Sequence, residues 1–149
     1  MNSKAAWIFG VLVLLLLPAR LRADPSPPPV VGMWQAYDDK TGHPNGVIRL
    51  YIQNGRLNGV VARLRDGVPA DATCFKCSPP MKDKPILGLV ILWGLKPDGD
   101  SWSGGTVLDP ESGDTYRCNV RLAAPDKLEL RGYVGISLFG RTQTWVRTR

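Results

Sequence analysis

Apolar and polar residues alternate with a period of two along most of the chain after residue 30. Short alternating runs are separated by clusters of Gly, Pro, Asn and Asp, and no window of ten residues carries a helical period of 3.6. The pattern predicts an all-β domain with eight strands. The expected strands are Val31–Tyr37, Val47–Gln53, Arg56–Leu64, Ile86–Leu95, Trp102–Leu108, Thr115–Leu122, Leu128–Ile136 and Arg141–Thr148.

The dipeptide Asn54-Gly55 lies between the second and third expected strands and sets their register. Asn-Gly is the preferred sequence of a two-residue type I′ turn, so Gln53 is expected to pair with Arg56. Counting back from this pair places the apolar residues of both strands on one face. The residues expected to face inward from this hairpin are Ile48, Leu50, Ile52, Leu57, Gly59 and Val61, and those from the sixth and seventh strands are Tyr116, Cys118, Val120, Leu122, Leu128, Leu130, Gly132, Val134 and Ile136.

The connections between strands favour a meander of consecutive hairpins. Turn sequences with Pro and Gly occur at 97–100, 109–113 and 124–127. Closing such a meander into a small up-and-down barrel removes both exposed sheet edges, and a two-sheet sandwich is the alternative. The segment Arg65–Pro85 is the longest irregular stretch, which in a small domain marks a lid-like loop or a tethered excursion.

The first residues have the pattern of a signal peptide. Lys4 precedes the apolar run 5–17, which is shorter than the roughly 20 residues of a membrane-spanning helix and is followed by Pro18. Cleavage is expected after Ala23, with Ala19 as the second candidate site and an uncleaved anchor as the alternative. We therefore expect a leader at 1–23, a Pro-rich tether at 24–29, and a soluble exported domain at 30–149 with no stable membrane insertion.

Charge adds little to this interpretation. The formal charge falls from +6 to about +3 on loss of the leader, which carries three basic residues and no acid. The remaining basic residues are spread along the whole chain, whereas binding to nucleic acid needs them gathered on one surface. Nucleic acid is therefore not an expected partner.

Several motifs together resemble a known bacterial family. They are Gly32-Met33-Trp34, Cys74-Phe75-Lys76-Cys77, Trp102-Ser103-Gly104-Gly105, Arg131-Gly132-Tyr133-Val134-Gly135 and the run 140–147. The chain resembles the bacterial domain of unknown function number 2147 over essentially the whole domain. The resemblance implies a periplasmic protein with a lipocalin-like β-barrel, and it transfers no catalytic or ligand-binding residue.

The Gly-x-Trp element also resembles the first strand of the wider calycin group. In that group the Trp closes one barrel end beneath a basic side chain from the last strand. The resemblance makes Trp34 the plug and Arg147 its cover, with Arg141 as the second candidate. A guanidinium over an indole ring is a favourable cation–π arrangement. Ordinary core packing of Trp34 is the alternative.

The cysteines have several possible roles. Cys74 and Cys77 have the spacing of a redox dithiol, but Pro residues follow them where a helix would be needed to lower a thiol pKa. We favour a structural disulfide within the long loop. A zinc site that combines this pair with Cys118 and His43 is disfavoured, because no second closely spaced ligand pair is present. Cys118 is expected to be a buried free thiol.

The sequence offers no arrangement for catalysis. His43 is the only histidine, and no Gly-x-Ser-x-Gly motif is present. The acidic residues Asp109, Glu111 and Asp114 fall in a turn where backbone geometry already explains them. We therefore expect no enzyme activity, no cofactor and no metal.

The favoured function is the binding of a small, apolar molecule by a non-enzymatic barrel. An eight-stranded barrel can be filled by its own side chains or can hold one small ligand. The residues expected to line a pocket are Leu50, Gly59, Tyr116, Leu130 and Gly132. The alternative is a filled barrel that acts as a structural or protein-interaction module of the envelope, through an unknown partner, with contacts at Tyr51, Tyr133 and the loop around Phe75.

Overall fold

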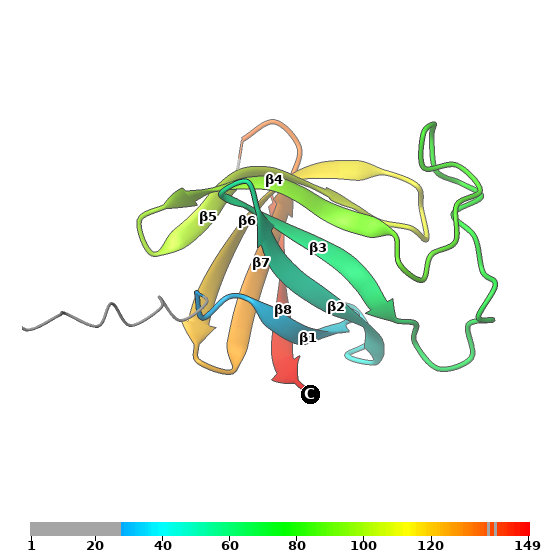
Figure 1. The fold of residues 1–149 in the computed structure, drawn as a ribbon, viewed down its shortest axis with the longest axis horizontal. Helices are drawn as coiled ribbons and strands as arrows, with labels where there is room; N and C mark the ends of the chain where they lie inside the picture. Colours follow the sequence, from blue (N-terminus) through cyan, green and yellow to red (C-terminus); the bar gives the residue numbers. More distant parts are fainter. Residues whose placement is uncertain (1–27, 137, 139) are drawn as a thin grey trace, which may run out of the picture.

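The protein is an antiparallel β-barrel of eight strands (Figure 1). The computed structural model describes residues 28–136, 138 and 140–149. The leader 1–23 and most of the expected tether therefore lie outside the described residues. The strands are β1 (Gly32–Tyr37), β2 (Pro44–Gln53), β3 (Arg56–Arg63), β4 (Val90–Asp98), β5 (Ser101–Leu108), β6 (Thr115–Ala124), β7 (Lys127–Tyr133) and β8 (Gly140–Thr148).

The barrel is closed by pairing between its first and last strands. Each strand pairs antiparallel with the next along the chain, as a meander requires, and β1 also pairs with β8. Trp34 lies opposite Arg147 in this final ladder. Closure satisfies the backbone groups that both edge strands would otherwise expose. The expected barrel is confirmed, and the sandwich alternative is wrong.

The register expected for the first tight hairpin is confirmed. Asn54 and Gly55 both have positive φ, of 53° and 70°, as a type I′ turn demands. Gln53 pairs with Arg56, and Ile48 pairs with Val61. Turn chemistry and the hydrophobic pattern therefore select the same pairing.

Four expected strand boundaries are wrong by three residues or more. The second strand begins at Pro44 rather than at Val47, and the fourth ends at Asp98 rather than at Leu95. The fourth strand begins at Val90 rather than at Ile86, whose amide donates a hydrogen bond of 2.9 Å to the Ala72 carbonyl within the long loop. The seventh strand ends at Tyr133, so Val134 and Ile136 lie beyond it and are not buried; they are 71% and 60% exposed. Gly135, with a φ of 73°, turns the chain there.

One half of the barrel is filled by its own side chains. The largest fully buried side chains of the strands are Trp34, Leu50, Leu57, Leu92, Leu95 and Leu128, with Val47, Val120 and Cys118. Most of them come from the inward rows of neighbouring strands, which alternate with exposed positions as a barrel wall requires. The barrel thus has a closed, packed end.

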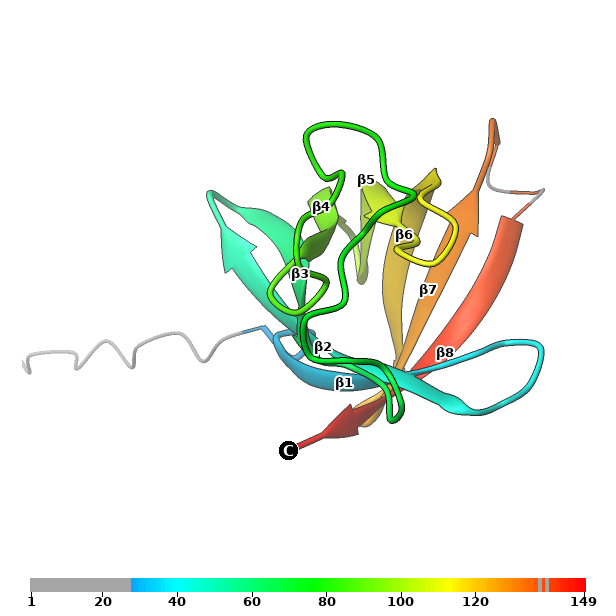
Figure 2. The ribbon, with the colours of Figure 1, turned by 90° about the vertical axis from the view of Figure 1, so that its right-hand side faces the viewer.

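The long segment between β3 and β4 lies at the opposite end, where it crosses in front of the barrel (Figure 2). It is held together by a disulfide between Cys74 and Cys77 and by an isolated bridge between Thr73 and Pro85. The Cys74 amide also donates a hydrogen bond of 2.9 Å to the Lys84 carbonyl. This segment is therefore an ordered excursion with its own internal contacts.

Candidate functional site

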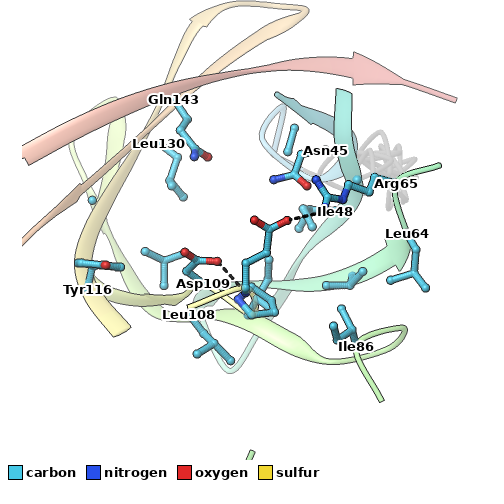
Figure 3. A pocket seen from close by; sticks show the side chains of 18 of the residues that line it. Asn45, Ile48, Leu64, Arg65, Ile86, Leu108, Asp109, Tyr116, Leu130 and Gln143 are labelled. Atoms are coloured by element: carbon cyan, nitrogen blue, oxygen red, sulfur yellow. Dashed lines mark hydrogen bonds and ion pairs between the residues drawn. The ribbon is translucent and has the colours of Figure 1, made fainter. Parts of the chain in front are cut away.

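A cavity of about 910 Å³ opens at the end of the barrel where β3 and β7 finish and β6 and β8 begin (Figure 3). Its volume lies within the usual range for small-molecule sites. The inner wall is formed by apolar side chains of the strands, and the long loop contributes to the rim. The apolar lining includes Ile48, Val61, Ile91, Val107, Leu108, Leu130 and Trp145.

Three of the five residues expected to line a pocket lie in this cavity. Tyr116, Leu130 and Gly132 all contribute to its wall. A Cβ atom placed on Gly132 would approach no atom of another strand more closely than 3.8 Å. The glycine therefore leaves open space on the inner face of β7.

Leu50 and Gly59 do not line the cavity, so this part of the expectation is wrong. Both belong to the packed end of the barrel. A Cβ atom on Gly59 would lie 2.9 Å from Leu50 Cδ2 and 3.1 Å from Leu92 Cβ. Gly59 allows close packing between strands, which is the other common reason for a glycine in a strand.

Polar and charged side chains surround the mouth of the cavity. They are Asn45, Arg63, Arg65, Lys76, Asp109, Glu111, Arg141 and Gln143. Arg65 forms an ion pair of 3.2 Å with Glu111, and Arg141 forms one of 3.0 Å with Asp39. The site thus combines an apolar interior with a charged rim, an arrangement suited to an amphipathic ligand.

The inward row of β8 supplies much of the polar character of the interior. Arg141, Gln143 and Trp145 line the cavity, and Arg147 follows in the same row at the closed end. Figure 3 shows Gln143 projecting into the cavity beside Leu130. Sequence reasoning did not single out Gln143 or Trp145. Their period-two spacing with the two arginines was the available signal.

Trp34 and Arg147 close the other end of the barrel, where the resemblance to calycins places them. Trp34 is fully buried, and the Arg147 guanidinium carbon lies 4.2 Å from the centre of its ring. The Trp34 indole donates a hydrogen bond of 2.9 Å to the Val30 carbonyl. Arg147 donates hydrogen bonds to the carbonyls of Pro29, Val31 and Pro125. Arg141, the second candidate for this cover, lies at the open end.

The cysteines do not form a joint site. Cys74 and Cys77 are bonded to each other and buried, and Cys118 is a buried free thiol on β6. Burial raises the pKa of Cys118 to about 12, so this thiol is neutral at physiological pH. In the part of the chain that the structure describes, no group of three His, Cys, Asp or Glu side chains is arranged to hold a metal ion.

The acidic residues after β5 serve the turn in which they lie. The Asp109 carboxylate accepts hydrogen bonds of 2.9 Å from the Glu111 amide and 3.0 Å from the Ser112 hydroxyl. Asp114 donates its amide to the Ser112 hydroxyl oxygen at 3.2 Å. These contacts are those of an Asx-type turn and account for the acidic residues structurally.

A barrel of eight antiparallel strands, plugged at one end by a tryptophan under an arginine and open at the other, is a lipocalin-like β-barrel. The chain belongs to the family described as "Uncharacterized protein conserved in bacteria (DUF2147)", whose model matches residues 32–147. The resemblance drawn from the sequence motifs is therefore confirmed.

A solved structure supports the same fold. Protein HP1028 from the human pathogen Helicobacter pylori, described as belonging to the lipocalin family, matches with a TM-score of 0.70 and 22% sequence identity, over 80% of this chain and 82% of that chain. A comparison with curated proteins gave no match. Among the described residues, no helix has the length and apolar character needed to span a membrane.

Proposed function

We propose that this protein is a non-enzymatic binder that holds a small, largely apolar molecule in the open half of its barrel. The observation that carries the proposal is the cavity of about 910 Å³ with an apolar inner wall, next to a half of the barrel that is fully packed. An eight-stranded barrel of this kind has room for one small ligand. An apolar lining favours a hydrophobic ligand over a sugar or a nucleotide.

The proposal includes export to the periplasm, which rests on the leader pattern of residues 1–23 and on the family resemblance. A non-enzymatic role is supported by the environment of the single histidine. His43 is exposed in the turn between β1 and β2, and its hydrogen bonds there are made by its backbone. General base catalysis would instead need its ring to be held against a nucleophile.

Binding of an apolar fluorescent dye tests this function. We expect the wild-type protein to bind the dye and Gly132→Leu to lose at least tenfold in affinity, because the new side chain fills open space on the cavity wall. Thr144→Leu is the matched control, since Thr144 is exposed on the same barrel wall and lies outside the cavity. Folded wild-type protein that binds no dye, fatty acid or quinone would contradict the proposal.

A second candidate function, an envelope interaction module, has one observation in its favour. The large hydrophobic side chains exposed in the described part of the chain all lie in the two loops at the open end: Phe75, Leu87, Val134, Ile136 and Leu138. Exposed apolar groups of this kind often mark contact surfaces. By contrast, Tyr51 and Tyr133 are half-buried. Cross-linking in the cell that captures one protein through a probe at Phe75, with no dye bound by the purified barrel, would favour this function.

A further inference from the structure

The inner face of β3 changes from apolar to cationic at the mouth of the cavity. Leu57 and Val61 are buried members of its inward row, and Arg63 is the next residue in that row. Arg63 is exposed and lines the cavity. A guanidinium therefore stands where a ligand seated against Val61 would reach the solvent.

Charges around the mouth are not balanced. Four basic side chains line the cavity, namely Arg63, Arg65, Lys76 and Arg141, but only two acidic ones do, namely Asp109 and Glu111. Arg65 is neutralised by Glu111, and Arg141 by Asp39. Within the described ranges, no carboxylate lies within ion-pair distance of Arg63 or Lys76.

The two carboxylates at the mouth are engaged with the protein. Asp109 uses one oxygen for the Glu111 amide and the other for the Ser112 hydroxyl. Glu111 is held by Arg65. Both acidic groups are thus engaged with the protein, and they are outnumbered by the four basic side chains of the lining, so the excess at the mouth is positive.

Uncharged groups on the wall add donors. The Gln143 side-chain oxygen accepts a hydrogen bond of 3.2 Å from the Trp145 indole, which leaves the amide nitrogen to donate. Gln143 projects into the cavity in Figure 3, and Tyr116 also lines its wall. A ligand group rich in hydrogen-bond acceptors therefore fits this wall better than one rich in donors.

We propose that the ligand is an anionic amphiphile, whose apolar chain packs against Ile48, Leu108 and Leu130 and whose carboxylate or phosphate head binds Arg63 at the mouth. The proposal rests on the function proposed above and names the chemical class of its ligand. Arginine presents a planar fork of donors that matches the oxygens of either head group. The apolar chain of the ligand accounts for most of the surface buried on binding, and the positive charge of Arg63 selects an anionic head group.

Titration calorimetry with four ligands of equal chain length, each below its micelle concentration, tests the proposal. They are dodecanoate, dodecyl phosphate, dodecanol and dodecyltrimethylammonium. We expect at least one anion to bind about tenfold more tightly than dodecanol, with a preference that weakens as salt is added. The tighter of the two anions identifies whether a carboxylate or a phosphate head is the natural partner.

Variants of one residue then locate the head group. The measured quantity is the ratio of the Kd of dodecanol to that of the preferred anion. We expect Arg63→Gln to lower this ratio to threefold or less and Arg63→Lys to keep most of it. Arg49→Gln is the control, because Arg49 is exposed outside the cavity on β2 and should leave the ratio at about tenfold. Melting temperatures establish that each variant is folded.

The outcomes separate the two proposals. Equal binding of dodecanol and both anions, tighter binding of the ammonium compound, or an unchanged ratio in Arg63→Gln would overturn the anionic ligand while leaving an apolar binder in place. Failure of all four ligands to bind a folded protein would overturn both.

Discussion

At the scale of single residues, two glycines on inward strand faces have opposite structural roles: one allows close packing and the other leaves open space. Gly59 lies where the barrel is packed, and a Cβ atom there would lie 2.9 Å from Leu50 Cδ2 and 3.1 Å from Ile48 Cγ2. A Cβ atom on Gly132 meets nothing of another strand nearer than 3.8 Å. The alternating pattern placed both glycines on the inner face, but it could not distinguish an absent side chain that allows packing from one that leaves a cavity.

This difference gives a prediction for matched variants. Gly59→Ala should destabilise the fold by about 1–3 kcal/mol, because the added methyl group must displace close-packed neighbours. Gly132→Ala should change stability by less than about 0.5 kcal/mol, because its methyl group enters open space. Urea unfolding of both variants and of the wild-type protein measures these changes in the free energy of unfolding. Equal losses at the two sites would show that the packed end of the barrel adapts to the extra volume.

Cys118 gives a pH-dependent prediction. Its pKa is raised by burial from about 9 to about 12 in the folded state, so the thiol ionises first in the unfolded chain. The contribution to stability is complete below pH 9 and is lost as the pH rises from 9 toward 12. By pH 10 the wild-type protein should therefore lose about 1 kcal/mol more of its unfolding free energy than Cys118→Ala does.

Urea unfolding at pH 8 and pH 10 measures the two losses. The Cys118→Ala variant is the reference, because the other groups that titrate in this range affect both proteins equally. Native Cys118 should also resist alkylation at pH 8 and react once the protein is unfolded. Rapid alkylation of the folded protein would show that the thiol is accessible and would contradict its burial.

At the scale of strands and turns, the features that could be predicted are those that short segments encode. The Asn54-Gly55 turn sets the pairing of β2 with β3 because it allows only one two-residue hairpin. The start of β4 could not be predicted, because Ile86 and Leu89 are apolar in a loop as they would be in a strand. Their place depends on contacts with Ala72 and Val61, which are distant in sequence.

The candidate site was predictable only in part for a similar reason. Tyr116 and Leu130 could be assigned to the inner face from alternation alone. Alternation does not show which end of the barrel holds the cavity. That depends on where the apolar side chains of each inward-facing row end and on the position of the long loop. The polar row of β8 was overlooked because Gln143 resembles an outward position in a strand with few aliphatic residues.

The closed end of the barrel gives a prediction at this scale. Arg147 ties β8 to the chain before β1 and to the β6–β7 turn, through the Val31 and Pro125 carbonyls and the ring of Trp34. Arg147→Gln should cost about 2 kcal/mol, as a sheltered cation–π contact and charge-assisted hydrogen bonds are lost. Arg149→Gln, at the exposed last residue, should change stability little. Thermal unfolding compares them, and equal melting temperatures would show that Trp34 is held by packing alone.

At the scale of the whole molecule, the two ends of the barrel have divided roles. The end that carries Trp34 and Arg147 is sealed by hydrogen bonds to the backbone of the segment before β1 and of the β6–β7 turn. The open end carries the cavity, the disulfide-bonded loop and the exposed apolar side chains. The packed end can therefore provide most of the stability, while the loops at the open end can differ in charge and shape without unfolding the barrel. Functional residues are often found on loops that a rigid scaffold holds in place.

The location of the protein in the cell decides the state of this loop, because Cys74 and Cys77 form a disulfide only in an oxidising compartment. We expect export of the full chain with cleavage after Ala23, so that the mature protein begins at Asp24 and carries one thiol that reacts after denaturation. Leu14→Lys places a charge within the apolar run of the leader and should block export. The retained protein should then show three reactive thiols. N-terminal sequencing of periplasmic and cytoplasmic fractions identifies the cleavage site, and thiol trapping counts the reactive thiols in each fraction. A start at Met1 in the membrane fraction would contradict cleavage, and a disulfide in the retained Leu14→Lys protein would show that the loop oxidises without export.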